Sequence, residues 1–207
     1  MDSIKTNTCQ FSEKEKIIIE AARKRFAHFG YSKVSMEEIA VDVDLGKASL
    51  YYYFPTKENL YQAVLSKEQN GFIKEIEGLI ASKISAGEKL VEFVNMRIIY
   101  FKRFLNLGTL SLHAFMDSKS FYTKLFLNFE DQELILIDRI ISEGQSNGEF
   151  EKKLDSKTAT VLLHVLHGLR IRVSRGIKEL EVSDEAIRQL QTEMNIAIRI
   201  FIKGISK

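Results

Sequence analysis

The sequence predicts an all-α protein, and two observations carry this prediction. The 207 residues include a single proline, Pro55, and eleven glycines that fall mostly between apolar-periodic stretches instead of inside them. Within those stretches, apolar residues recur at the spacing of one helix face. The composition, 45% hydrophobic and 28% charged, is typical of a globular protein. No stretch approaches the roughly eighteen apolar residues of a membrane span, so no membrane partner is expected.

The first two helices are predicted from their start signals. Ser12 is a good N-cap and Glu15 completes a capping box, so a helix is expected over 13–29. Gly30 follows, and glycine readily adopts the left-handed conformation that ends many helices. Ser35 and the glutamate three positions after it repeat the box, which predicts a second helix of barely two turns.

A second short helix is predicted over 47–54, and a long helix follows it. Pro55 disfavours a helical conformation at the residue before it, and Thr56 can cap the long helix. Helices of only two turns bury little surface alone. Each short helix must therefore pack on the flanking long helices and leave its other face free.

Beyond residue 72 the chain predicts longer helices, without a low-complexity linker or an internal repeat. Breaks are expected at glycines and at polar turns such as the sequence SNGEF. The long helix capped by Thr56 would join the two parts of the chain. The later helices are predicted roughly over 86–104, 107–118, 121–146, 155–179 and 183–204.

The sequence GKASLYYYF over 46–54 places three tyrosines in a row. Successive residues of a helix point about 100° apart, so the three cannot all face a core. Leu50 and Phe54, four positions apart, make a buried edge with Tyr51 near them. A cation, small side chains and tyrosine hydroxyls then remain for phosphates and base edges, as in a recognition helix; an ordinary aromatic packing helix is the alternative. The expected free face carries Lys47, Ala48, Ser49 and Tyr52, and Tyr53 is unassigned.

Residues 35–65, which read SMEEIAVDVDLGKASLYYYFPTKENLYQAVL, resemble the signature of the TetR-type (tetracycline repressor family) transcriptional regulators. The preceding sequence AARKRFAHFGYSKVS matches as well, so the resemblance covers about 12–70. It implies a three-helix helix-turn-helix DNA-binding domain over 12–70. It also implies a larger helical domain over 71–207 that dimerises and holds a small-molecule effector.

The resemblance further implies which residues contact operator DNA. Ser35 would contact phosphate at the start of the second helix, and residues 47–49 would face bases. Tyr51 and Tyr52 would contact backbone phosphates, although burial in the core competes for Tyr51. Lys57 begins the fourth helix, where its ammonium and the helix dipole both attract phosphate. The implied set is Ser35, Met36, Lys47, Ala48, Ser49, Tyr51, Tyr52 and Lys57.

Two features limit the attraction that this region can exert on DNA. Asp44 stands at the turn position that the family usually fills with glycine. Aspartate tolerates the left-handed conformation, so the turn should form, but its charge is unfavourable near phosphates. Residues 1–60 hold nine basic and nine acidic side chains, so a local patch must provide the attraction.

The last two predicted helices carry apolar stripes that fit a core or an intersubunit four-helix interface equally well. The resemblance implies a homodimer through these helices. Geometry supports it, because a helix-turn-helix normally reads two half-sites through a two-fold dimer. The stripes comprise Leu162, Val165, Leu166 and Leu169, then Ile187, Leu190, Met194, Ala197, Ile198 and Phe201.

The middle helices are crowded with aromatic residues, most of which are expected in the core. Polar groups among them are better indications of a pocket, because a largely apolar pocket with a few polar groups suits a hydrophobic effector. The basic cluster of Arg170, Arg172 and Arg175 is expected to solvate a helix end, or to receive an acyl or carboxylate head group. The candidate effector residues are Tyr100, Phe104, Asn106, His113, Met116, His164, His167 and Arg170.

Other functions receive weaker support. His164 and His167 share a helix face and could bind a metal with His113, but no Cys, Asp or Glu joins them at ligand spacing. An enzyme using these histidines as a general base lacks any accompanying motif, so we expect no catalytic residue and no cofactor. A helical ligand-binding protein that has lost DNA binding is a further alternative. The sequence favours a repressor released from its operator by an effector.

The single cysteine, Cys9, cannot form an internal disulfide, and the N-terminal stretch lacks the basic and apolar regions of a signal peptide. A cytoplasmic location is therefore expected.

Overall fold

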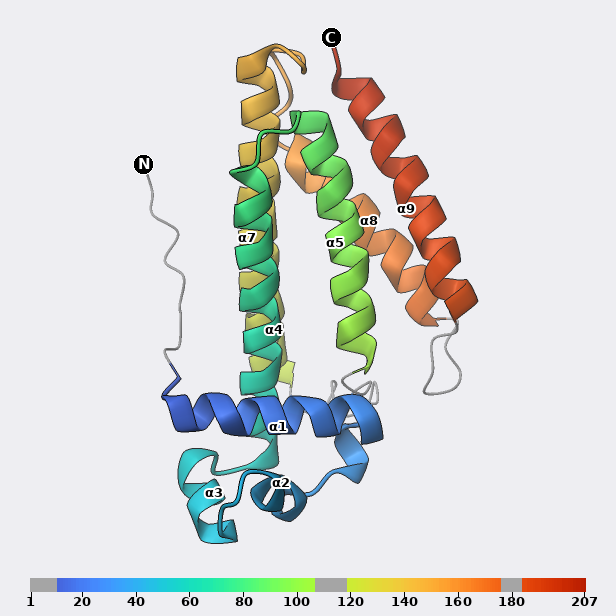
Figure 1. Cartoon of the computed structure of the whole chain (residues 1–207). Helices are drawn as coiled ribbons and strands as arrows, with labels where there is room; N and C mark the ends of the chain where they lie inside the picture. The colour runs from blue at the N-terminus through green and yellow to red at the C-terminus, as the bar shows by residue number, and fades with distance from the viewer. Residues whose placement is uncertain (1–10, 107–118, 176–183) are drawn as a thin grey trace. The chain divides into compact units, whose positions relative to one another are not determined.

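The computed structural model describes residues 11–106, 119–175 and 184–207. Over these ranges the regular elements are helices, with one isolated bridge between Phe150 and Ser206, so the all-α prediction is confirmed. The helices are α1 (Glu13–Phe29), α2 (Met36–Asp42), α3 (Lys47–Tyr53), α4 (Lys57–Ile80), α5 (Ala86–Asn106), α7 (Lys119–Asn147), α8 (Thr158–Arg175) and α9 (Asp184–Ile205), with a short 3-10 turn at Tyr31–Lys33 (Figure 1). Each of these helices is too short or too polar to span a membrane.

Capping residues set the helix starts in the N-terminal part. Ser12 and Ser35 each accept a hydrogen bond from the third amide of their helix, and the glutamate there accepts one from the serine amide, at 2.8 and 2.7 Å. Thr56 Oγ1 accepts the amide of Asn59 at 3.0 Å where α4 begins. The predicted helix over 107–118 lies outside the described residues.

The chain divides into two compact units. The first comprises Met1–Gly71 with Arg103–Leu125, and the second comprises Phe72–Lys102 with Phe126–Lys207. Helix α4 therefore contains the boundary at Gly71 and Phe72.

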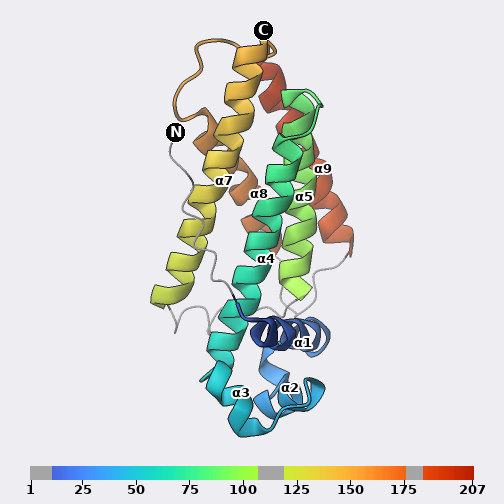
Figure 2. The ribbon, with the colours of Figure 1, turned by 60° about the vertical axis from the view of Figure 1, so that its left-hand side comes forward.

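In the first unit, α2 and α3 lie side by side on the same side of α1, as the two views agree (Figures 1 and 2). Helix α2 packs against both α1 and α3. The Phe26 and Tyr61 rings pack edge to face with centroids 5.3 Å apart. Ile39 of α2 and Leu50 of α3 are fully buried in this unit. This core fixes the inner faces of the two short helices and leaves their outer faces free.

The core of the second unit centres on aromatic rings. The Phe72 ring lies 6.0 Å from Phe93, 5.1 Å from Tyr100 and 5.7 Å from Phe129, measured between centroids. Helices α8 and α9 pack against each other in the same unit. The prediction that most aromatics of the middle helices belong to the core is confirmed for the side chains that the structure describes.

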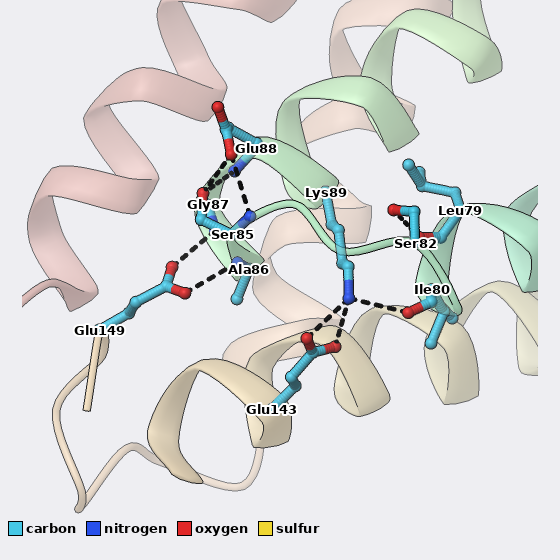
Figure 3. A network of polar contacts seen from close by, with 10 residues as sticks. All are labelled: Leu79, Ile80, Ser82, Ser85, Ala86, Gly87, Glu88, Lys89, Glu143 and Glu149. Atoms are coloured by element: carbon cyan, nitrogen blue, oxygen red, sulfur yellow. Dashed lines mark hydrogen bonds and ion pairs between the residues drawn. The ribbon is translucent and has the colours of Figure 1, made fainter. Parts of the chain in front are cut away.

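A polar network in the second unit joins three helices (Figure 3). The buried ammonium of Lys89 on α5 donates to the carboxylate of Glu143 on α7 at 2.6 Å and to the Ile80 carbonyl at the end of α4 at 2.8 Å. The Glu149 carboxylate accepts the first two amides of α5 at 3.0 and 3.1 Å. The start of α5 is thereby tied both to the end of α4 and to α7.

Candidate nucleic-acid interface

The turn between α2 and α3 depends on one left-handed residue. Asp44 has a φ of 53°, and no other non-glycine residue of the described ranges has a positive φ. The amide of Leu45 donates to the Ala40 carbonyl at 2.9 Å, which closes the turn. The turn therefore forms with aspartate at the position expected to favour glycine.

Helix α3 has the two faces that its sequence predicts. Leu50 is fully buried and Phe54 is nearly so. Tyr52 is 83% exposed and its ring packs edge to face on the half-buried Tyr53. Tyr51 is 36% exposed, so it lies at the border between the two faces. The exposed side, called here the α3 free face, consists of Lys47, Ala48, Ser49 and Tyr52.

The cation of the α3 free face has a protein partner. Lys47 Nζ lies 2.5 Å from Glu37 Oε1 on α2, and both side chains are exposed. The same ammonium lies 5.9 Å from the centroid of the Tyr51 ring. The hydrogen bond to Glu37 raises the pKa of Lys47, so this side chain is a cation at neutral pH. This pair was not predicted from the sequence.

The start of α2 offers backbone groups more than side chains. The Ser35 hydroxyl caps α2, accepting the Glu38 amide at 3.2 Å and donating to the Glu38 carboxylate at 2.9 Å. Met36 is only 4% exposed and packs in the core. Its predicted contact with DNA can therefore come only from its main chain. The spacing of Met36 with Ile39 and Ala40 was the signal that places it on the buried face.

Arg25 of α1 holds the remaining acidic side chains of α2. Its guanidinium donates to both carboxylate oxygens of Asp42, with Nη2 to Oδ1 at 2.8 Å, and lies 3.4 Å from Glu38. The hydrogen bond from Arg25 lowers the pKa of Asp42. With Glu37 beside Lys47, each of the three carboxylates of α2 lies next to a cation, but two cations are shared among three carboxylates. Sequence reasoning missed Arg25 because its partner lies seventeen positions away.

Lys57 begins α4, as predicted, but its ammonium lies over an aromatic ring. Lys57 Nζ is 4.4 Å from the centroid of Tyr31, a cation–π distance. Partial burial lowers the pKa of Lys57. A phosphate that contacts Lys57 as predicted would therefore have to approach its ammonium beside the Tyr31 ring.

In the second unit, the structure brings together three of the eight candidate effector residues. Tyr100 and Arg170 line a cavity with Phe101, Phe129 and Met194, and the Arg170 guanidinium lies 5.6 Å from the Phe101 centroid. Burial lowers the pKa of Arg170. The cavity measures only about 10 Å³, the room of one water molecule, so an effector would have to open it.

The third residue, His167, joins a buried ion pair that the sequence analysis missed. Arg97 donates to both oxygens of Glu133, at 2.5 and 3.1 Å, and both side chains are buried. His167 Nε2 lies 3.9 Å from the same carboxylate. Burial alone would raise the pKa of Glu133, but Arg97 and His167 outweigh it and lower that pKa. Arg97 also lines the cavity beside Arg170.

The other candidate effector residues do not join this group. The His164 side chain is 65% exposed, and its Nε2 lies 4.0 Å from Glu130 Oε1. It does not line the cavity beside Arg170. Among the described residues, no three metal-binding side chains gather at one place. Phe104, Asn106, His113 and Met116 lie outside the described side chains.

Comparison with known proteins identifies both parts of the chain. Residues 18–64 match the model of the bacterial regulatory proteins of the tetR family, and residues 65–168 match that of the C-terminal region of YsiA-like proteins. The solved structure of a transcriptional regulator from Cytophaga hutchinsonii is 38% identical, with a TM-score of 0.88 over 95% of this chain and 100% of that one.

Curated relatives agree with this assignment. The fatty acid metabolism regulator protein of Bacillus subtilis is 25% identical over 146 residues, which is 70% of this chain and 75% of that protein. The HTH-type transcriptional regulator YuxN of the same organism is 48% identical over 54 residues, so the chain aligns with 19% of that relative's length. The α3 free face lies within residues 18–64, the range that the tetR-family model matches. The chain therefore belongs to the tetR family of bacterial regulatory proteins and is a DNA-binding transcriptional regulator, not an enzyme.

Proposed function

We propose that this regulator is a cytoplasmic repressor that binds operator DNA as a homodimer and leaves it when a small, largely apolar effector binds. The observation that carries the DNA-binding part is the α3 free face, which exposes a cation, two small residues and a tyrosine on one side of a short helix. Small side chains allow close approach to a base edge, and the cation and hydroxyls supply its hydrogen bonds.

Within this proposal each residue has a role. Lys47, Ala48 and Ser49 face bases, and Tyr51 and Tyr52 contact phosphates on either side of them. Ser35 and the Met36 amide, at the positive end of α2, add a phosphate contact. Lys57 contributes from the start of α4. These assignments combine the family resemblance with the exposure of each side chain.

The test removes the cation and the hydroxyl groups of the α3 free face. Replacing Lys47, Ser49 and Tyr52 together with alanine should weaken binding to an operator selected from a random duplex library by roughly 100-fold or more, since each base contact contributes about 1–3 kcal/mol. Fluorescence anisotropy measures the affinity. Circular dichroism and sedimentation check that fold and assembly are unchanged. Lys153→Ala with Ser156→Ala, exposed in the second unit, is the control. Unchanged operator affinity in the triple variant would contradict the recognition-helix assignment.

The homodimer proposal rests on the outer faces of α8 and α9. These two helices pack on each other and still leave large apolar side chains exposed, which is typical of surface covered by another chain. The family dimerises in order to read two half-sites. The exposed apolar side chains are Val161, Val165, Ile171, Ile196 and Ile200.

The effector proposal rests on the cavity beside Arg170 and on the fatty acid metabolism regulator among the relatives. Aromatic walls suit an apolar chain, and the Arg170 guanidinium suits an acidic head group. Binding would favour a conformation in which the two α3 helices are wrongly spaced for DNA, with α4 transmitting the change.

Dodecanoate should therefore release the protein from the selected operator, and acetate should not. Arg170→Met should lose this response, while His164→Ala, exposed on the same helix, should keep it. Anisotropy of the labelled operator reports the release. Release by neither acid, or equal release from Arg170→Met, would contradict the proposal.

A further inference from the structure

The inference concerns the ion pair between Lys47 and Glu37, and it rests on the proposed DNA contact of α3. Lys47 is the only basic residue of α3, the helix over Lys47–Tyr53. Its ammonium is already 2.5 Å from the Glu37 carboxylate on α2. A phosphate and Glu37 therefore compete for the same cation.

Glu37 is the acidic residue of α2 that forms an ion pair with α3. Glu38 caps its own helix and lies beside Arg25, and Asp42 accepts hydrogen bonds from Arg25. Arg25 belongs to α1, so these two carboxylates tie α2 inward to the core of the unit. Only Glu37, among the acidic side chains of α2, is paired with a residue of the α3 free face.

We propose that Glu37 is a positioning residue that determines specificity, because it keeps Lys47 from the phosphates of unrelated DNA. Binding to unrelated sequences depends almost entirely on contacts between cations and phosphates. A lysine held by a carboxylate contributes little to such binding. On the operator, base contacts hold α3 in the groove. The exposed ion pair between Lys47 and Glu37 is weak, so it can open and Lys47 can contact a base.

Direct repulsion between the Glu37 carboxylate and DNA is a simpler explanation, and it must be distinguished from the positioning of Lys47. A carboxylate near DNA repels phosphates directly, so any loss of its charge strengthens binding. Glu37→Asp distinguishes the two, because aspartate keeps the charge but is one methylene shorter and loses contact with Lys47. If Glu37 acts by holding Lys47, the aspartate and glutamine variants behave alike. If it acts by repulsion, the aspartate variant resembles the wild type.

The experiment uses the full chain and a random-sequence duplex of about 30 base pairs, which spans two half-sites. Affinity is measured by anisotropy between about 50 and 200 mM salt. Glu37→Gln and Glu37→Asp should both bind this duplex several-fold more tightly than the wild type. The plot of log affinity against log salt should steepen by about 0.9, as expected for one added phosphate contact. The preference for the selected operator should fall.

Two further variants complete the design. In a Lys47→Ala background, Glu37→Gln should change neither affinity nor salt slope, because the residue it acts through is missing. Glu13→Gln removes an equal charge from an exposed pair with Lys16 on α1, 2.6 Å apart, and should leave binding unchanged. Melting temperatures of all variants check that the glutamine and aspartate substitutions leave the fold intact.

The outcomes separate the inference from the proposed function. Tighter binding that persists in the Lys47→Ala background, or that is absent from Glu37→Asp, would show direct repulsion and overturn the positioning role. Unchanged salt slopes in both Glu37 variants would overturn it as well. A wild type that binds no duplex, selected or random, would contradict the proposed function itself and the inference with it.

Discussion

Glu20 of α1 is held by cations from its own helix and from α4. Its carboxylate accepts hydrogen bonds from Arg23 Nη2 at 2.6 Å and from Lys67 Nζ at 2.9 Å. The hydrogen bond from Arg23, followed by the contributions of Lys67, outweighs burial and lowers the pKa of Glu20 from 4.5 to about 2. A carboxyl whose pKa is depressed on folding stabilises the protein above its unfolded pKa, and that stability is lost as pH falls towards the folded value.

Glu20→Gln should therefore reduce the free energy of unfolding at pH 7 and have little effect near pH 2. The side chain is 37% exposed, so screening limits the loss to about 1 kcal/mol. Urea denaturation between pH 7 and pH 2 measures it, and the difference between variant and wild type should shrink from about pH 4.5 downwards. Glu13→Gln, which removes a fully exposed partner of Lys16, is the control. A constant difference across the pH range would contradict the prediction.

Single residues were predictable where a local rule decides them. The 100° step of a helix separates Leu50 from Tyr52, and the tolerance of aspartate for positive φ allows Asp44 in its turn. The pairing of Lys47 with Glu37 was not predictable in the same way. It depends on the angle at which α2 and α3 cross, and the apolar pattern of each helix does not specify that angle.

At the scale of elements, local signals account for most helix boundaries. Capping serines start α1 and α2 where the sequence predicts, because the cap is an interaction over three residues. Helix α8 begins at Thr158 instead of 155. The Asp155 carboxylate accepts the Lys157 amide at 2.7 Å, and its carbonyl accepts the Thr158 amide at 3.0 Å, so a turn precedes the helix. Aspartate commonly forms such side-chain turns.

The hydrogen bonds and ion pairs between helices were not predictable from the sequence. Lys89 and Glu143 are 54 positions apart, and Glu149 reaches the first amides of α5 from 62 and 63 positions away. Hydrophobic periodicity shows which face of α5 is buried, but it cannot assign a partner to a lysine on that face. The buried pair of Arg97 and Glu133 illustrates the same limit.

At the scale of the whole molecule, the candidate effector residues show that a pattern of residue types does not determine the environment of each side chain. His164 and His167 share a helix face in sequence terms, yet one is exposed and the other faces a buried carboxylate. A small angular offset at the edge of a helix stripe decides between these environments. The candidate cavity arises only from the packing of α5, α7, α8 and α9, which no single helix encodes.

The dimer is the prediction that belongs to the whole molecule. Val165 on α8 is 44% exposed and Ile200 on α9 is 68% exposed, so neither is required by the core of one chain. Val165→Glu with Ile200→Glu would bury uncompensated charges if these helices form the interface. The double variant should sediment as a monomer at concentrations where the wild type is a dimer. It should keep the wild-type circular dichroism spectrum.

The same variant should bind the selected operator much more weakly, because two α3 helices that are no longer joined must occupy their half-sites independently. Ile135→Glu on α7 is the matched control, since Ile135 is 43% exposed but lies outside α8 and α9. It should remain dimeric and bind the operator normally. If the double variant stays a dimer, the interface lies elsewhere, and the exposed apolar side chains of α8 and α9 need another explanation. If it becomes a monomer with unchanged operator affinity, one α3 helix suffices for recognition and the two-half-site model fails.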